Sequence, residues 1–278
     1  MTVTLKRWSQ LGLSAALATT ALSACGSSDE AEQSVKSEIV AETPPAPIAE
    51  PAPVASAGGE GEGGVLFDQA ATDPVIFGSA LAIAEAHIIA ARDAHALGEN
   101  DAAAEMFAHP VSEVLFNMQP VFETRGVTDF SDMFTDASAA VFAGETPEQI
   151  SARTDDIIAT LRTAALKAPS SDMTDARIAA GVAADQIERA ADMYRIALES
   201  DAYEPYLDGY GFFKAGEVAF LAKADAIAEE DQRAASAIKD ALAKLEDAYP
   251  SAVRPASLDA DVSLLTVAAS EVVLAVTN

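Results

Sequence analysis

Cysteine, histidine and aromatic residues are all scarce in this chain of 278 residues. It holds one cysteine and three histidines, and aromatic residues make up 6% of it, although half of its residues are hydrophobic. A single cysteine cannot form an internal disulfide bond. The apolar fraction is mainly Ala, Val, Leu and Ile, which favours slender, closely packed helices over a β-sheet.

Basic residues are also few, with 17 Lys and Arg against 44 Asp and Glu, which gives a formal net charge of −27. An acidic surface of this kind repels the phosphates of nucleic acids and anionic lipid head groups, so we expect no nucleic-acid partner. It attracts cations, although an acidic surface is also the ordinary surface of a soluble domain.

Motifs of the common enzyme classes are missing from the sequence. There is no GxSxG, no phosphate-binding loop, no Rossmann glycine pattern and no HExxH. The histidines show no recognised motif that pairs them with a serine nucleophile, and the one cysteine has a different expected role, described next. We therefore expect that the protein is not an enzyme.

The N-terminal segment has the organisation of a bacterial lipoprotein signal. Lys6 and Arg7 precede an apolar stretch at residues 10–22, which is too short to span a bilayer permanently. The stretch ends in "LSAC", which resembles the lipobox whose cysteine is acylated and becomes the first mature residue. We expect residues 1–24 to be a signal peptide and Cys25 to carry acyl chains such as palmitate; the alternative is an ordinary signal peptide with a chance cysteine.

The residue after the cysteine bears on where the protein is retained. It is Gly26 rather than aspartate, which favours the outer membrane of the bacterial envelope, with the protein facing the periplasm. A cell-surface lipoprotein is the alternative. In both cases the membrane is a partner through the lipid anchor.

Two further parts follow the signal peptide. Residues 25–64 comprise the acylated cysteine and a tether rich in Pro, Gly and Glu, with no apolar periodicity, so we expect this segment to be disordered. Residues 65–278 have helical periodicity almost throughout and form the expected folded domain.

The domain is predicted to be all-α, an antiparallel bundle of seven or eight helices. It is either one bundle or two sub-bundles that meet near residues 168–172. Pro110 should interrupt the second helix, and "ETPEQ" is a helix start with Thr146 as the cap. A turn is expected around Pro205 and Gly209, and Ser257 is the expected N-cap of the last helix. The expected helices are 74–97, 101–122, 128–143, 146–168, 172–199, 211–228, 231–248 and a last one to the C-terminus.

All three histidines lie in the first predicted hairpin, at positions 87, 95 and 109. With the turn centred on residue 99, His87 and His109 fall at nearly the same height on the two helices. Glu113 lies one turn further along, near the height of Glu85. Two imidazoles and one or two carboxylates at one level suit Zn²⁺, Cu²⁺ or iron. The alternative is a kinked helix with buried structural histidines.

Two other features of the sequence have both a functional and a structural interpretation. Asp185, Glu188 and Asp192, at spacings of three and four, form either an acidic stripe, of which Asp185 and Glu188 are alternative metal ligands, or a solvated helix face. Residues 203–217 hold the densest aromatic cluster of the chain, which is either core or a ligand pocket.

Two stretches resemble the imelysin-like family, which includes the periplasmic component of the Efe-type iron-uptake system. The run "ARDAHALGENDAAAEMFAHPVSEVL" resembles the first hairpin of that family, and "FKAGEVAFLAKADAIAEEDQRAASAIKDALAKLEDAYPS" resembles its last helices. The family's metal motif, Gly-x-His-x-x-Glu, is absent. Its nearest counterpart is "ADQIE", in which Asp185 stands in place of the histidine and Glu188 matches the glutamate.

The resemblance implies an imelysin-like helical domain that binds a divalent or ferric metal ion for uptake. An envelope metal transporter or receptor would then be a partner. The alternative function is that of a non-enzymatic structural or interaction lipoprotein with no metal ligand.

Replacing Cys25 with Ala should release the protein from the membrane fraction, because the acyl chains would have no attachment site. Fractionation of cells followed by immunoblotting measures this. Mass spectrometry that finds a free thiol at Cys25 in membrane-associated wild type would contradict the prediction.

Overall fold

The computed structural model describes residues 65–277, which are mostly helical with no β-strand among them. The predicted signal peptide, the lipidated Cys25 and the tether lie outside the described residues. The all-α prediction is therefore confirmed for the described part of the chain. Its helices are α1 Phe67–Ala70, α2 Pro74–Ala96, α3 Asn100–Pro110, the π-helix η1 Val111–Leu115, α4 Phe116–Arg125, α5 Ser131–Phe142, α6 Pro147–Ala165, α7 Asp175–Glu199, α8 Glu204–Leu221, α9 Ala224–Glu230, α10 Gln232–Ala248 and α11 Val262–Thr277.

Helix α2 is the central element of the described fold. It begins at the N-cap Asp73, whose carboxylate accepts hydrogen bonds from the backbone N–H groups of Val75 and Ile76. It packs against α3, α6, α7 and α8. It is long and apolar enough to cross a membrane by composition, but 72% of its most apolar window is buried inside the fold. Because neighbouring helices cover it on several sides, its apolar character is that of a core helix.

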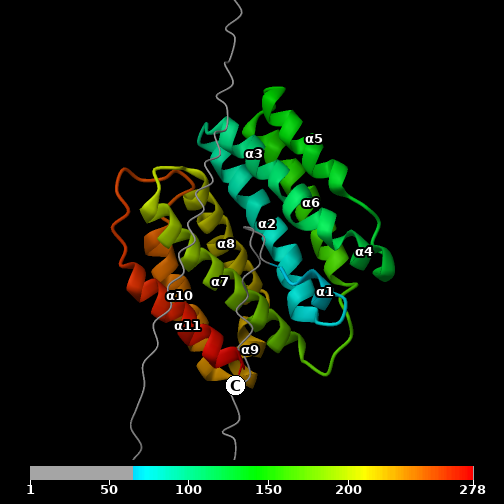
Figure 1. Cartoon of the computed structure of the whole chain (residues 1–278), viewed down its shortest axis with the longest axis vertical. Coiled ribbons are helices and arrows are strands. Elements are labelled where there is room, and N and C mark those ends of the chain that lie inside the picture. Colours follow the sequence, from blue (N-terminus) through cyan, green and yellow to red (C-terminus); the bar gives the residue numbers. More distant parts are fainter. Residues whose placement is uncertain (1–64, 278) are drawn as a thin grey trace, which may run out of the picture. The chain divides into compact units, whose positions relative to one another are not determined.

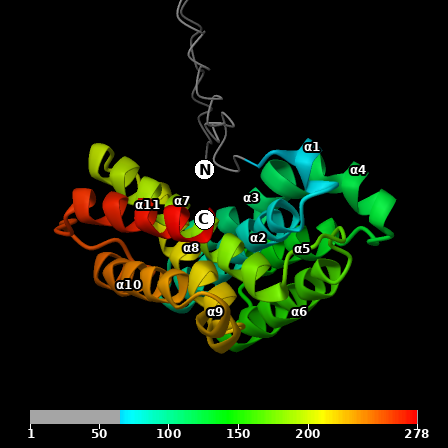
Figure 2. The ribbon, with the colours of Figure 1, turned by 90° about the horizontal axis from the view of Figure 1, so that it is seen from below.

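The remaining helices form two groups around α2 and its neighbours. Helices α3 to α6 follow α2 on one side, where α3 packs against α5 and α5 against α6. Helices α7, α8, α10 and α11 pack together on the other side, as Figures 1 and 2 both show. Residues 166–174 connect α6 to α7, and the two groups belong to one compact unit, so the predicted division into two sub-bundles stays a prediction.

The predicted second helix is divided into three segments. Pro110 ends α3, and the chain continues through the π-helix η1 into α4. Proline has no N–H to donate, so the regular hydrogen-bond ladder is broken at this point. A π-helix at a site with functional side chains is a recurring arrangement. The predicted interruption of the α-helix at Pro110 is confirmed, and it takes the form of a π-helical segment.

The start of α6 follows the prediction closely. The Thr146 side chain accepts from the Gln149 backbone N–H, and the Gln149 side chain accepts from the Thr146 backbone N–H. This reciprocal pair is the capping box that "ETPEQ" predicted.

Three predicted features of the C-terminal half are wrong. Pro205 and Gly209 do not form a turn: Pro205 lies in the first turn of α8 and Gly209 inside it, where proline is tolerated because the first N–H groups have no helical partner. The predicted helix 211–228 is two helices, α8 and α9. Ser257 does not cap the last helix, which begins at Val262. Instead, the carboxylate of Asp261, the residue before this helix, accepts a hydrogen bond from the Ser263 backbone N–H.

The aromatic cluster of residues 203–217 is largely core. Tyr206, Phe212 and Phe213 are buried, and Tyr206 lies against Tyr249 with ring centroids 5.2 Å apart. The hydroxyl of Tyr206 is hydrogen-bonded as well: it donates to the Ser251 carbonyl at 2.9 Å. These rings are therefore part of the core, as the structural interpretation of the cluster predicted.

Helices α2 and α8 approach closely because small residues line their contact. A Cβ added to Gly211 would lie 2.5 Å from the carbonyl oxygen of Ala86 and 3.2 Å from the Cβ of Ala90. Only glycine fits at this position of α8 without displacing the α2 backbone. The contact lies one residue from His87 on α2 and three residues from Asp208 on α8, so it sets the separation of these two side chains.

Replacing Gly211 with Ala should lower the free energy of unfolding by about 1–3 kcal/mol, because the added methyl group overpacks the contact with the α2 backbone. Urea denaturation of the full chain, followed by far-ultraviolet circular dichroism, measures the change. Gly216→Ala is the matched control on the same helix, since the nearest atom to its Cβ would be the Gln186 Cβ at 3.3 Å and the nearest backbone atom, the Ala183 carbonyl oxygen, would lie 3.6 Å away. Equal losses in the two variants would contradict the assignment.

Candidate metal centre

His87 presents one ring nitrogen to the interior of the site. Its Nδ1 lies 2.8 Å from the carbonyl oxygen of Ile83, one turn earlier on α2. A carbonyl only accepts, so Nδ1 is the donor and carries the proton. Nε2 is buried and makes no hydrogen bond of normal geometry with another described residue. This orientation is the one found in metal sites, where a histidine ligand donates its other N–H to a carbonyl or carboxylate.

His109 and Glu113 come from the interrupted second helix. Glu113 lies on η1, and its Oε2 is 3.4 Å from Nε2 of His87 while its Oε1 is 3.6 Å from Nδ1 of His109. The two imidazole rings are edge to face, with centroids 5.8 Å apart. Glu113 therefore lies between the two histidines, one from each helix of the hairpin.

Helix α8 supplies two more carboxylates. Asp208 is buried, and its Oδ1 lies 3.5 Å from Nε2 of His87. Glu204, one turn earlier on the same helix, has its Oε1 3.5 Å from Nε2 of His109. Ligand atoms of His87, His109 and Asp208 all lie within 4.8 Å of one another.

The separations between these donor atoms match the edges of a metal coordination shell. Charge-assisted N–H···O hydrogen bonds are usually about 2.7–2.9 Å long, whereas the four imidazole–carboxylate pairs measure 3.4–3.6 Å. In a tetrahedral site with bonds of about 2.0–2.2 Å, neighbouring ligand atoms are about 3.3–3.6 Å apart. Nε2 of His87 thus lies at such a distance from one oxygen of Glu113 and from one oxygen of Asp208.

The electrostatics of the site favour a positive charge at its centre. Burial alone would lower the pKa of His87, but the contact with Glu113 and the charges of Asp208 and Glu113 outweigh it and raise the pKa to about 8. Burial would raise the pKa of Glu113, and the contacts with His87 and His109 outweigh it and lower the pKa. A proton on His87 or a metal cation supplies the positive charge that the two carboxylates require.

The structure brings together three of the residues that the sequence nominated as metal ligands: His87, His109 and Glu113. The prediction that the two imidazoles lie at one level with a carboxylate within about 4–5 Å is confirmed as geometry. That a metal binds there stays a prediction.

Glu85 is not part of this cluster. Its carboxylate accepts a hydrogen bond from the Arg162 guanidinium of α6 at 2.9 Å. Glu85 precedes His87 by two residues, and two residues turn an α-helix by about 200°, so the two side chains point to opposite sides of α2. Glu85 lies at about the predicted height along α2, but its side chain is on a different face of the helix from that of His87.

Asp185 and Glu188, the alternative metal ligands, lie on α7 without a third donor close by among the described residues. Asp185 accepts from the Arg189 side chain at 3.0 Å and from Gln186 at 2.9 Å. Burial and the charges of Asp192 and Asp185 raise the pKa of Glu188. This part of α7 is an arrangement of ion pairs and hydrogen bonds.

Asp208 and Glu204 were not identified from the sequence. The predicted turn around Pro205 and Gly209 concealed that both residues lie on one face of a helix. A signal was nevertheless present, because Asp208 is a charged residue within an aromatic run whose other members are mostly buried.

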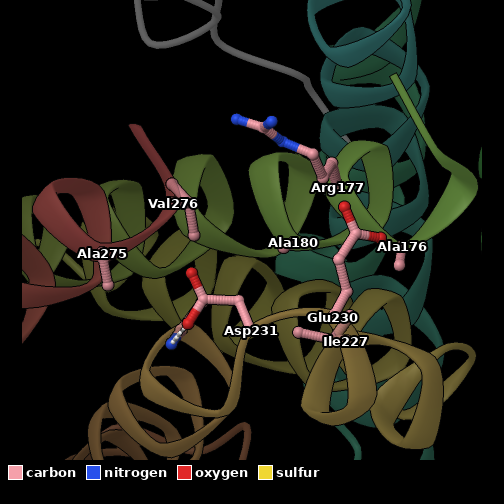
Figure 3. A pocket seen from close by; sticks show the side chains of 9 residues that line it. Ala176, Arg177, Ala180, Ile227, Glu230, Asp231, Ala275 and Val276 are labelled. Carbon is pink, nitrogen blue, oxygen red and sulfur yellow. Dashed lines mark hydrogen bonds between the residues drawn. The ribbon is translucent and has the colours of Figure 1, made fainter. Parts of the chain in front are cut away.

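A separate cavity of about 150 Å³ lies between α7, the connection from α9 to α10, and α11 (Figure 3). Two acidic residues line it, and both are already engaged. Asp231 caps α10 through the N–H groups of Arg233 and Ala234, and Glu230 accepts from the Thr174 hydroxyl at 2.6 Å. Figure 3 shows the Arg177 guanidinium directed away from both carboxylates. This cavity has no imidazole and is a weaker candidate than the histidine cluster.

No family model, curated protein or solved structure matches this chain. The candidate metal centre is therefore supported by its own geometry.

In the metal-free chain, His87 should make stability depend on pH. Its pKa is about 8 in the folded state against 6.5 for an unperturbed histidine. The protonated form is thus stabilising below pH 6.5, and this contribution is lost as pH rises through 8, on the order of 1–2 kcal/mol. Urea denaturation with chelator between pH 6 and about 9 measures it. His87→Gln should flatten this dependence, and an unchanged profile in the variant would contradict the assignment.

Proposed function

We propose that this protein is a lipid-anchored protein of the bacterial envelope whose helical domain binds a transition-metal ion. The ligands are His87 and His109 with the carboxylates of Asp208 and Glu113. The observation that carries the proposal is the orientation of His87. One of its nitrogens is fixed by the Ile83 carbonyl, and the other is buried, facing two carboxylates at coordination-shell distance.

The donor set narrows the metal. Two imidazoles and two carboxylates suit iron, Zn²⁺ or Cu²⁺, whereas Ca²⁺ and Mg²⁺ prefer oxygen ligands alone. No cysteine thiolate contributes, since the only cysteine is the proposed acylation site. A soft ion that requires thiolates is therefore a poor match.

The wider role follows from the imelysin-like resemblance of the first hairpin and last helices. Its support is an all-helical domain in which the first hairpin carries two of the ligands. We propose that the antiparallel bundle is imelysin-like and that the protein serves metal uptake without enzymatic activity. It would deliver the ion to an envelope transporter or receptor, from the periplasmic face of the outer membrane.

A second function, a structural or interaction lipoprotein without a metal, is favoured by one specific observation. Protonation of His87, with its raised pKa, supplies by itself the positive charge that Glu113 and Asp208 require. The cluster would then be a buried polar network that stabilises the bundle. Metal titration separates the two functions.

Wild-type full chain purified without chelator should bind about one metal ion per molecule at the histidine cluster. Metal analysis, followed by calorimetric titration with Zn²⁺, Cu²⁺ and Fe³⁺, measures this. His87→Ala, His109→Ala and Asp208→Asn should each weaken binding at least about 100-fold, because each removes a ligand. Affinity should also fall with decreasing pH as protons compete for the imidazoles.

Glu85→Gln is the matched control, because it removes an acidic side chain two residues from His87 on the opposite side of α2. It should retain wild-type affinity, and circular dichroism should show that every variant is folded. Absence of metal binding by wild type would establish the structural function instead. So would an affinity in the three ligand variants that equals that of wild type.

A further inference from the structure

The side chains of the candidate centre form a continuous series from the interior to the surface. The exposed fraction of the side chain is 1% for His87 and for Asp208, 15% for His109, 22% for Glu113 and 41% for Glu204. Glu105, one turn before His109 on α3, is exposed. Donor atoms are thus available at every depth between solvent and the buried end of the site.

His109 belongs to two groups of donors at once. Its Nδ1 faces Glu113 at 3.6 Å, on the buried side, and its Nε2 faces Glu204 at 3.5 Å, on the exposed side. Ligand atoms of Glu105, His109 and Glu204 lie within 4.8 Å of one another, as do those of His87, His109 and Asp208. Because an imidazole has two ring nitrogens, the same residue can hold a cation from either side.

We infer that Glu105, His109 and Glu204 form an outer site through which a divalent transition-metal ion reaches the buried ligands. This inference rests on the proposed metal-binding function. The outer carboxylates replace part of the ion's water shell at the surface. His109 and Glu113 then replace further waters as the ion moves inward, until His87 and Asp208 complete the coordination.

The physical advantage of an outer site is a stepwise loss of hydration. A divalent cation that enters a buried site in one step must lose its water before it gains its ligands, which makes the step slow. Exposed carboxylates attract the cation and exchange ligands with water readily, so the ion has already lost part of its water when its bond to Nε2 of His109 breaks and the buried donors bind it. The outer site therefore governs the rate of binding, and the buried ligands govern its strength.

Removing the outer carboxylates should slow binding and leave the buried ion in place. We expect Glu105→Gln combined with Glu204→Gln to reduce the association rate of Co²⁺ at least about fivefold at an ionic strength of about 0.15 M, where long-range steering is largely screened. Dissociation should slow as well, because release follows the same route. Stopped-flow absorbance of the full chain with Co²⁺ measures both rates.

Glu99→Gln combined with Asp101→Asn is the matched control. It removes the same formal charge from the beginning of the helix that carries Glu105, without touching a donor of either group. Its association rate should stay within about twofold of wild type, as expected for a screened surface charge.

The possible outcomes separate this inference from the proposed function. If the Glu105/Glu204 variant binds Co²⁺ as fast as wild type, or if the control slows equally, the outer site is wrong while the buried site stands. Weaker equilibrium binding at an unchanged association rate would also overturn the access route, since the two glutamates would then be final ligands. If wild type binds no Co²⁺, Zn²⁺ or iron, both the proposed function and this inference fail.

Discussion

The close packing of α8 against α2 holds an aspartate and a histidine together inside an apolar core. Asp208 and His87 are both buried, and removing one charged group from water costs several kcal/mol unless an opposite charge lies beside it. The separation of the helices is set by Gly211, whose missing side chain admits the Ala86 carbonyl. A larger residue there would move Asp208 away from His87 and leave each with less compensation.

The third contributor, Glu113, lies on the π-helix that interrupts the second predicted helix. Pro110 ends α3 and the π-helix η1 carries Glu113 to a position between the two imidazoles. At this point the i→i−4 hydrogen bonds of an α-helix give way to those of a π-helix. Glu113 faces both histidines from this segment, so a backbone irregularity and a charge cluster coincide at one place.

The sequence predicted the candidate ligands that lie within the first hairpin. It missed those on α8, which is far from the hairpin along the chain. His87 and His109 lie on two helices joined by a short turn, so residue counting from the turn places them at one level. Glu85 failed the same argument because counting fixes height and leaves rotation open. Asp208 and Glu204 are about a hundred residues further along, and their approach depends on the packing of α8. No periodicity within one helix encodes that contact.

Helix boundaries show the same division between local and distant causes. Thr146 and Gln149 satisfy each other's backbone groups within one turn, so the start of α6 was predictable from five residues. Ser257 has the right side chain for a cap, yet α11 begins after Asp261, while the preceding residue, Ala260, donates its backbone N–H to the Tyr194 hydroxyl at 2.9 Å. That tertiary contact fixes the path of the chain before α11. The contact with Tyr194 of α7 therefore outweighs the local preference of Ser257 for an N-cap position.

The acidic composition and the histidine cluster have different effects on a cation. A net charge of −27 raises the local concentration of all cations and does not distinguish among them. Exposed carboxylates alone would bind Ca²⁺ and Mg²⁺, which are hard ions with oxygen ligands. Under the proposed function, the imidazoles would shift the preference toward transition metals, and His87 would be the ligand whose burial and fixed ring orientation make that preference strongest. Attraction would then follow from the overall charge, whereas selectivity would depend on a few side chains at the contact of α2, α3, η1 and α8.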